Sequence, residues 1–194
     1  MILEKGAKYA LCFNYMPVGH DADKDLIPTP AQREFMYRWL RKVRNSKTGK
    51  PLFVMDFQND AEYVGGCIAG GRNYFHINSA GDIEPCVFIH YSDTNIRTHT
   101  LKEALKSPLF MQYYKNQPFN DNHLRPCPML ENPEYLREMV KQSGAHSSDL
   151  LHAEDVDTLC DKCVDFADAW APEAERIWTS TTHRDTHTQY YRDT

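Results

Sequence analysis

The stretch Cys67-Ile-Ala-Gly-Gly-Arg-Asn-Tyr-Phe-His-Ile-Asn-Ser-Ala-Gly-Asp-Ile-Glu-Pro-Cys86 predicts a β-hairpin with one cysteine at each open end. Apolar and polar residues alternate from Tyr74 to Asn78, and Ile83 to Val87 returns as a second strand. Between the two runs, Gly81 can adopt the left-handed backbone that a tight turn needs. Because a hairpin brings its ends together, we expect Cys67 and Cys86 to lie close enough to bind a metal or form a disulfide.

The composition excludes several classes of protein. The chain has 194 residues, a net charge of −5 and no basic stripe, so nucleic-acid binding is not expected. No apolar run approaches the roughly 18 residues of a membrane span, and Met1 to Lys5 lacks the apolar stretch of a signal peptide. We therefore expect a cytoplasmic protein, and in a reducing compartment its six cysteines would serve metals more often than disulfides.

The N-terminal part predicts one βαβ unit with parallel strands. Tyr9 to Val18 and Leu52 to Phe57 are apolar runs typical of strands that are buried on both faces. Between them, Thr29 and Gln32 form a capping box that opens a helix ending before Gly49. The apolar residues of this helix recur at helical spacing: Phe35, Met36, Trp39, Leu40 and Val43. One such unit cannot cover both faces of its sheet, so we expect its edge to pair with another chain or with the rest of a larger sheet.

After the hairpin, the sequence predicts short helices joined by loops. Capping signals or apolar periodicity indicate helices that begin at Thr100, Ser107, Asn132 and Val156. Residues 117–131 contain three prolines and predict an irregular loop. From residue 179 onward the chain is poor in apolar residues, which predicts disorder.

Three cysteines form the candidate ligand set. Cys127 lies between two prolines that stiffen its loop, and with Cys67 and Cys86 it would give three thiols suited to a soft metal or an iron–sulfur cluster. Four ligands are usual, and the candidates for the fourth are Cys160, Cys163, a non-cysteine ligand or a substrate atom. Zinc is an alternative, although zinc knuckles usually supply two CxxC pairs and this chain has one.

The other candidates have structural interpretations as well. Cys12 lies in an apolar run and is predicted to be an inert buried thiol. Cys160 and Cys163 fall on the apolar stripe of a helix, which favours a place in the core over a role as ligands. The polar hairpin residues Arg72, Asn73 and His76 can either hydrogen-bond near a cluster or lie in solvent.

The pattern Cys67-x13-Gly81-x4-Cys86 resembles the opening motif of the SPASM and twitch domains that follow the barrel of radical S-adenosylmethionine enzymes. The resemblance implies that Cys67, Cys86 and Cys127 ligate an auxiliary [4Fe–4S] cluster. The further cysteine-dense segment of a full SPASM pattern does not occur, which implies a twitch-like version with one cluster.

The resemblance also implies an α/β (α+β) fold in three parts. Residues 1–62 would be the end of a partial (β/α)6 barrel, residues 63–178 the auxiliary cluster domain, and residues 179–194 a disordered tail. The sequence contains no CxxxCxxC, the motif that binds the radical-generating cluster, so S-adenosylmethionine would bind only in a full-length or complemented enzyme. We expect the isolated chain not to cleave it.

The function expected from the resemblance is that of a C-terminal part of a radical S-adenosylmethionine protein. Its cluster would anchor the substrate or transfer an electron. The alternatives are a ferredoxin-like electron-transfer module and a zinc-stabilised interaction module. Expected partners are the N-terminal half of a radical S-adenosylmethionine enzyme, or a second copy of this chain that pairs through the βαβ edge. An electron donor such as ferredoxin or flavodoxin is also expected. Binding to nucleic acid or to a membrane is not expected.

Overall fold

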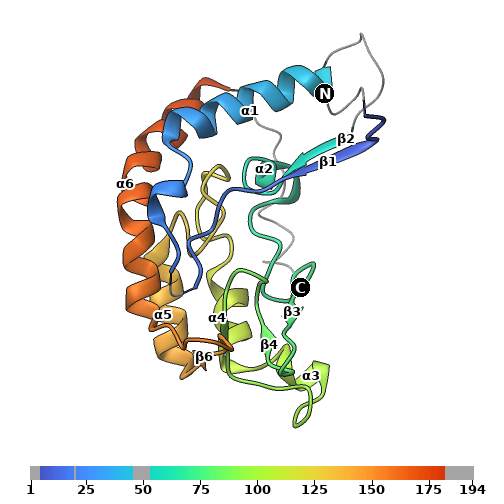
Figure 1. Ribbon diagram of the computed structural model, residues 1–194, viewed down its shortest axis with the longest axis vertical. Helices are drawn as coiled ribbons and strands as arrows, with labels where there is room; N and C mark the ends of the chain where they lie inside the picture. The colour runs from blue at the N-terminus through green and yellow to red at the C-terminus, as the bar shows by residue number, and fades with distance from the viewer. Residues whose placement is uncertain (1–4, 20, 46–52, 182–194) are drawn as a thin grey trace.

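The computed structural model describes residues 5–19, 21–45 and 53–181, and within these the fold mixes helices with small sheets (Figure 1). The helices are η1 Lys24–Leu26, α1 Pro30–Asn45, α2 Ala61–Val64, α3 Leu101–Ala104, α4 Pro108–Asn116, α5 Pro133–Ser143 and α6 Val156–Ser180. The strands are β1 Tyr9–Cys12, β2 Phe53–Asp56, β3 His76–Ile77, β4 Ile83–Glu84, β5 Tyr91–Ser92 and β6 His146–Ser147.

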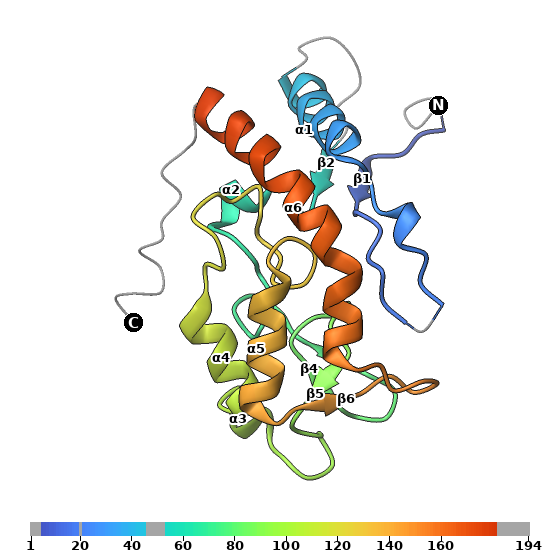
Figure 2. The same cartoon turned by 90° about the vertical axis from the view of Figure 1, so that its left-hand side faces the viewer.

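The helices form one side of the molecule, and the strands and the loops that carry the cysteines lie against it. Helix α5 packs between α4 and α6, and α1 crosses the far end of α6 (Figures 1 and 2). The main core fills the space between these helices and the loops, and its largest fully buried members include Trp170, Tyr113 and Leu130. No helix in the described ranges is both long enough and apolar enough to cross a membrane.

The predicted βαβ unit is confirmed in its topology. Strands β1 and β2 pair in parallel, with Tyr9 opposite Phe53, and α1 connects them. The Thr29–Gln32 capping box is present, since each residue's side chain accepts a hydrogen bond from the backbone N–H of the other. The first strand was predicted to reach Val18, but it ends at Cys12.

The predicted burial of this unit on both faces is wrong. Tyr9 and Phe53 are 68% and 60% exposed, and Phe35 on α1 is 64% exposed. In the described residues β1 and β2 pair only with each other, and no barrel is formed. Among the described helices and strands, α1 packs mainly on β2 and α6, so Tyr37 and Leu40 are buried while Phe35 and Trp39 stay exposed.

The predicted hairpin is also confirmed, with shorter strands than the alternation indicated. Strands β3 and β4 pair antiparallel, with Ile77 opposite Ile83. Gly81 has a φ of 91°, and a Cβ at this position would lie 2.9 Å from the side-chain oxygen of Asn95. The turn therefore requires glycine both for its backbone conformation and for the close approach of a neighbouring chain segment.

The C-terminal helices begin where the capping signals indicated. The Thr100–Glu103 capping box is complete, and Gly144 ends α5 in the left-handed conformation. Helix α6 runs to Ser180, beyond its predicted end, so the first residues of the predicted disordered tail are helical. The rest of that prediction, residues 182–194, lies outside the described residues. Helix α2 and the β5–β6 pair were not predicted, because elements this short carry no periodicity.

Candidate metal centre

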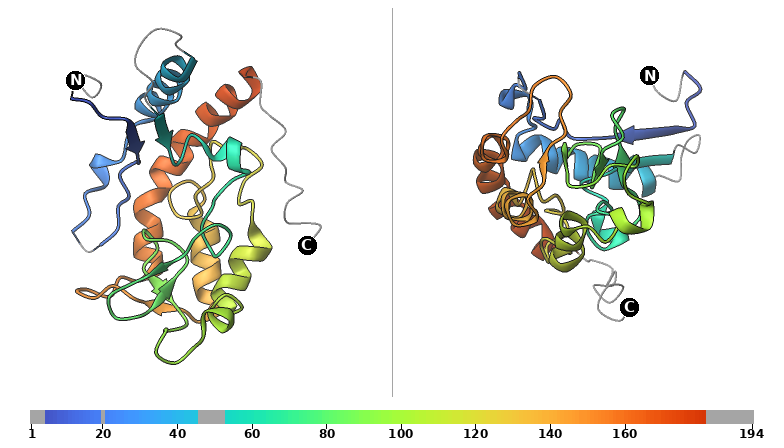
Figure 3. Two further views of the ribbon diagram at one scale, coloured as in Figure 1. Left: turned by 90° about the vertical axis from the view of Figure 1, so that its right-hand side faces the viewer. Right: turned by 90° about the horizontal axis from the view of Figure 1, so that it is seen from below.

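The three cysteines of the predicted ligand set come from separate loops. Cys67 lies shortly after α2, Cys86 lies two residues after β4, and Cys127 lies in the proline-rich loop that precedes α5. All three are free and partly buried, and they pack against the same main core. Figure 3 shows how these loops lie against the inner side of the helices.

The three thiols influence one another electrostatically, which places them in one group. Burial, and then the charge of Cys86, raises the pKa of Cys67 to about 12. Burial, followed by the charges of Glu131 and Cys67, raises the pKa of Cys127 well above its ordinary value. Burial also raises the pKa of Cys86. Such thiols stay neutral near pH 7, so binding of a metal here would release their protons.

Backbone N–H groups point at each of the three sulfur atoms. The donors are Ala69 to Cys67, Val87 and Phe88 to Cys86, and Met129 and Leu130 to Cys127, the last two at 3.4 Å. Hydrogen bonds of this kind stabilise a thiolate, which is the form that binds metal. The backbone around every member of the set is thus arranged for sulfur that carries negative charge.

The loop after Cys67 is fixed against the loop of Cys86. The backbone N–H of Gly70 donates to the carbonyl of Pro85 at 2.9 Å, so the two cysteine segments are directly connected. Gly70 has a φ of 68°, and a Cβ there would lie 2.4 Å from the ring of Tyr113. Glycine is needed here because the aromatic ring packs directly on the backbone.

A tyrosine hydroxyl adds a further contact to the group. The hydroxyl of Tyr74 lies 2.6 Å from the sulfur of Cys86 and forms a hydrogen bond with it. Tyr74 lies just before β3 on the hairpin, so the strand pairing that positions Cys86 positions this hydroxyl as well.

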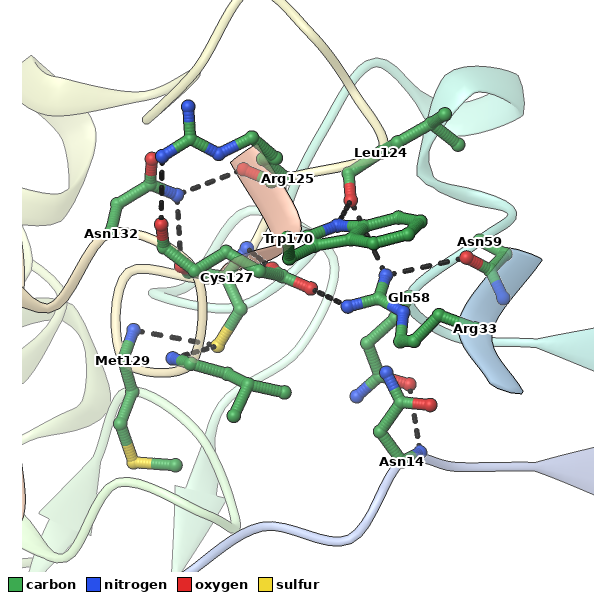
Figure 4. Close-up of polar contacts among 12 residues, drawn as sticks. Asn14, Arg33, Gln58, Asn59, Leu124, Arg125, Cys127, Met129, Asn132 and Trp170 are labelled. Carbon is green, nitrogen blue, oxygen red and sulfur yellow. Dashed lines mark hydrogen bonds and ion pairs between the residues drawn. The ribbon is translucent and has the colours of Figure 1, made fainter. Parts of the chain in front are cut away.

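A buried carboxylate shapes the loop of Cys127. Glu131 accepts a hydrogen bond from the backbone N–H of Cys127 at 2.7 Å, and its other oxygen accepts from Arg33 at 2.5 Å (Figure 4). Asn132 donates to the carbonyls of Arg125 and Cys127, which closes the loop from its other side. The carboxylate therefore connects the Cys127 backbone to a residue of helix α1.

Arg33 is enclosed by residues from distant parts of the chain. Both side chains of the Arg33–Glu131 ion pair are fully buried. The guanidinium lies over the ring of Trp170 at 4.5 Å and donates to the carbonyl of Leu124 and to the side chain of Asn59. Burial raises the pKa of Glu131, and the charge of Arg33 opposes that rise. The sequence did not predict that Arg33 is buried, because charged side chains on a helix are usually exposed to solvent.

Cys160 and Cys163 lie in the main core on helix α6 and are fully buried. The Cys163 thiol donates to the carbonyl of Leu159 within its own helix, at 3.7 Å. Burial raises the pKa of Cys163 to about 12 and that of Cys160 to about 11. These contacts are typical of core thiols. Cys12, predicted to be buried, is only partly so.

The polar hairpin candidates lie around the group with different contacts. Arg72 donates to the carbonyls of Gly65 and Cys67, so it holds the Cys67 loop. Asn73 donates its backbone N–H to the carbonyl of Ile68 in the same loop. His76 is half-exposed, and its Nε2 lies 3.9 Å from a carboxylate oxygen of Glu84.

Within the described part of the chain, no three His, Cys, Asp or Glu side chains are grouped so as to hold a single metal ion. Around one tetrahedral zinc, sulfur ligands lie about 2.3 Å from the metal and are therefore tightly clustered. The ligands of a four-iron cluster each bind a different iron, so their sulfur atoms are spread more widely. The donor set, three thiols with N–H groups directed at them, fits a cluster.

Comparison with known families agrees with this chemistry. Residues 67–129 match the family model of SPASM, an iron–sulfur cluster-binding domain, and the match spans Cys67, Cys86 and Cys127. The chain therefore contains a SPASM-type domain. Searches of curated proteins and of solved structures each found no match.

Proposed function

From the SPASM-type domain of residues 67–129, we propose that this chain is the C-terminal part of a radical S-adenosylmethionine enzyme and binds one auxiliary [4Fe–4S] cluster. Cys67, Cys86 and Cys127 are the proposed ligands. The unit formed by β1, α1 and β2 would be the last part of the enzyme's partial barrel. Since the chain contains no CxxxCxxC, the proposal assigns cleavage of S-adenosylmethionine to an N-terminal half.

The observation that carries the proposal is the donor set of the three cysteines. Each sulfur accepts at least one backbone N–H, whereas the thiol of Cys163 in the core donates to a carbonyl instead. Sulfur that accepts hydrogen bonds is suited to carry the negative charge of a cluster ligand. The SPASM match over the same residues supports iron and sulfide as what this set binds.

The bound cluster would supply an electron acceptor, or an iron that holds a substrate atom. The chain's own residues position and adjust it. The Arg33–Glu131 pair holds the backbone of Cys127, and the Gly70–Pro85 hydrogen bond holds Cys67 and Cys86 in register. We propose that the fourth iron is bound by a non-cysteine ligand or by substrate, because Cys160 and Cys163 have the contacts of core residues.

The test is the metal content of the 194-residue chain purified without oxygen. We expect iron and acid-labile sulfide in equal amounts, with about four of each per chain, a brown colour and absorption in the visible thiolate-to-iron region. Zinc without sulfide would contradict the proposal and support a zinc-stabilised module instead.

A partner at the β1–β2 sheet is part of the proposal. On these strands, Tyr9, Leu11 and Phe53 are 68%, 49% and 60% exposed. Exposed apolar residues beside unpaired strand edges favour association with another chain. The natural partner would be the N-terminal radical half, and the chain alone is expected to self-associate through this edge.

Size-exclusion chromatography with light scattering checks the self-association. Leu11→Lys should shift the protein toward monomer, because a charge on an edge strand opposes pairing. Leu151→Lys is the matched control, because Leu151 is 86% exposed and lies far along the chain from β1 and β2. This variant should leave the oligomeric state unchanged. A wild-type chain that is monomeric at all concentrations would contradict this part of the proposal.

A further inference from the structure

The hydroxyl of Tyr113 has no hydrogen-bond partner among the described residues, although the side chain is fully buried. Tyr113 lies on helix α4, and its ring makes an edge contact with Phe119. A buried hydroxyl without a partner destabilises a fold, whereas phenylalanine would fill the same space without that cost. The hydroxyl therefore indicates an acceptor that the protein itself does not provide.

The position of the ring points to where that acceptor lies. The Cβ, Cγ and Cδ1 atoms of Tyr113 pack on Gly70, in the loop between Cys67 and the hairpin. Burial, followed by the charges of Cys67, Cys86 and Cys127, raises the pKa of Tyr113 well above its ordinary value. After burial, the three proposed cluster ligands are thus the titratable groups that act most strongly on this hydroxyl.

Tyr74 approaches the same group from the hairpin. Its hydroxyl is hydrogen-bonded to the sulfur of Cys86, and the other two cysteines also act on it electrostatically. Tyr74 also acts electrostatically on Tyr113. The two phenols thus approach the same three cysteines from different parts of the chain, the hairpin and helix α4.

We propose that the Tyr113 hydroxyl donates a hydrogen bond to a sulfur atom of the bound cluster, and that Tyr113 and Tyr74 together raise the cluster's reduction potential. This inference rests on the proposed function. Reduction adds negative charge to the cluster, and a donor directed at its sulfur stabilises the reduced form more than the oxidised form. The two tyrosines are positioning and tuning residues, and they do not ligate iron.

The experiment measures the midpoint potential of the cluster in the full chain, with Tyr113→Phe, Tyr74→Phe and the double variant. Each single variant should shift the equilibrium between reduced and oxidised cluster roughly tenfold toward the oxidised form. For a one-electron couple, this equals a fall of about 59 mV in the midpoint potential. The double variant should fall further. Tyr91→Phe is the matched control, because Tyr91 is also buried but its hydroxyl donates to the carbonyl of Glu154.

Thermal unfolding gives a second result that does not depend on potential. Without the cluster, Tyr113→Phe should melt at the same temperature as the wild type or higher, because it removes an unpartnered hydroxyl. With the cluster bound, it should melt lower. Tyr91→Phe should lower the melting temperature in both forms, because its hydrogen bond is within the protein.

The possible outcomes separate this inference from the proposed function. A wild-type chain that takes up no iron and sulfide would overturn the proposed function itself. A normal cluster whose potential is unchanged in Tyr113→Phe would overturn the inference alone. Loss of iron in Tyr113→Phe but not in Tyr91→Phe would also overturn it, since Tyr113 would then be a ligand.

Discussion

Alanine in place of Cys67, Cys86 or Cys127, one at a time, is expected to remove most of the visible absorption and most of the iron of the anaerobically purified protein. Each substitution deletes one thiolate ligand, and the N–H groups directed at its sulfur cannot replace it. The measurement is iron and sulfide per chain, together with the absorption spectrum.

Two other cysteines provide the controls. Cys12→Ala should keep the full cluster content, because Cys12 lies at the end of β1, outside the three-cysteine group. Cys160→Ala should also keep it, and should cost roughly 1–2 kcal/mol of unfolding free energy as a core truncation. Unchanged iron content in Cys67→Ala would refute the ligand assignment, and loss of iron in Cys160→Ala would make that residue the fourth ligand.

Breaking the Arg33–Glu131 pair is expected to have the largest effect on stability. Arg33→Met leaves the carboxylate of Glu131 buried without its cation, and such a change costs about 3–5 kcal/mol. Because the same carboxylate accepts the backbone N–H of Cys127, the variant should also lose its cluster faster on exposure to a chelator. Urea unfolding measures the first effect, and the decay of visible absorption measures the second.

A second variant separates the charge from the shape of this pair. Glu131→Gln keeps an acceptor for the Cys127 N–H, and in the double variant with Arg33→Met no charge is left unpaired. The double variant should therefore be less destabilised than the sum of the two single variants. Arg38→Met is the control on the same helix, since both side chains of the Arg38–Glu34 pair are partly exposed, and such a pair is worth about 0–1 kcal/mol. Equal losses in Arg38→Met and Arg33→Met would argue against a special role for the buried pair.

Local signals in the sequence predicted much of this fold. The capping boxes at Thr29 and Thr100 and the glycine turn at Gly81 act within a few residues, so their structural consequences can be read without knowing the rest of the molecule. The hairpin also predicted that Cys67 and Cys86 lie close together, and in the structure the Gly70–Pro85 hydrogen bond connects their two segments. The roles of the three cysteines as ligands stay a prediction that the alanine series tests.

The burial of individual side chains and their hydrogen-bond partners depend on which elements pack against one another, and only the tertiary structure decided them. The sequence by itself determined the hairpin, the parallel βαβ unit and the candidate cysteine set, because these depend on backbone conformation and short-range order. It did not determine that Arg33 is buried against Glu131, because the two residues are 98 positions apart in the chain. It also did not determine that the Tyr113 hydroxyl has no hydrogen-bond partner within the described residues, because other loops form the surroundings of that hydroxyl. It also did not show that Tyr9 and Phe53 are exposed, because exposure depends on what covers a strand and not on the strand itself.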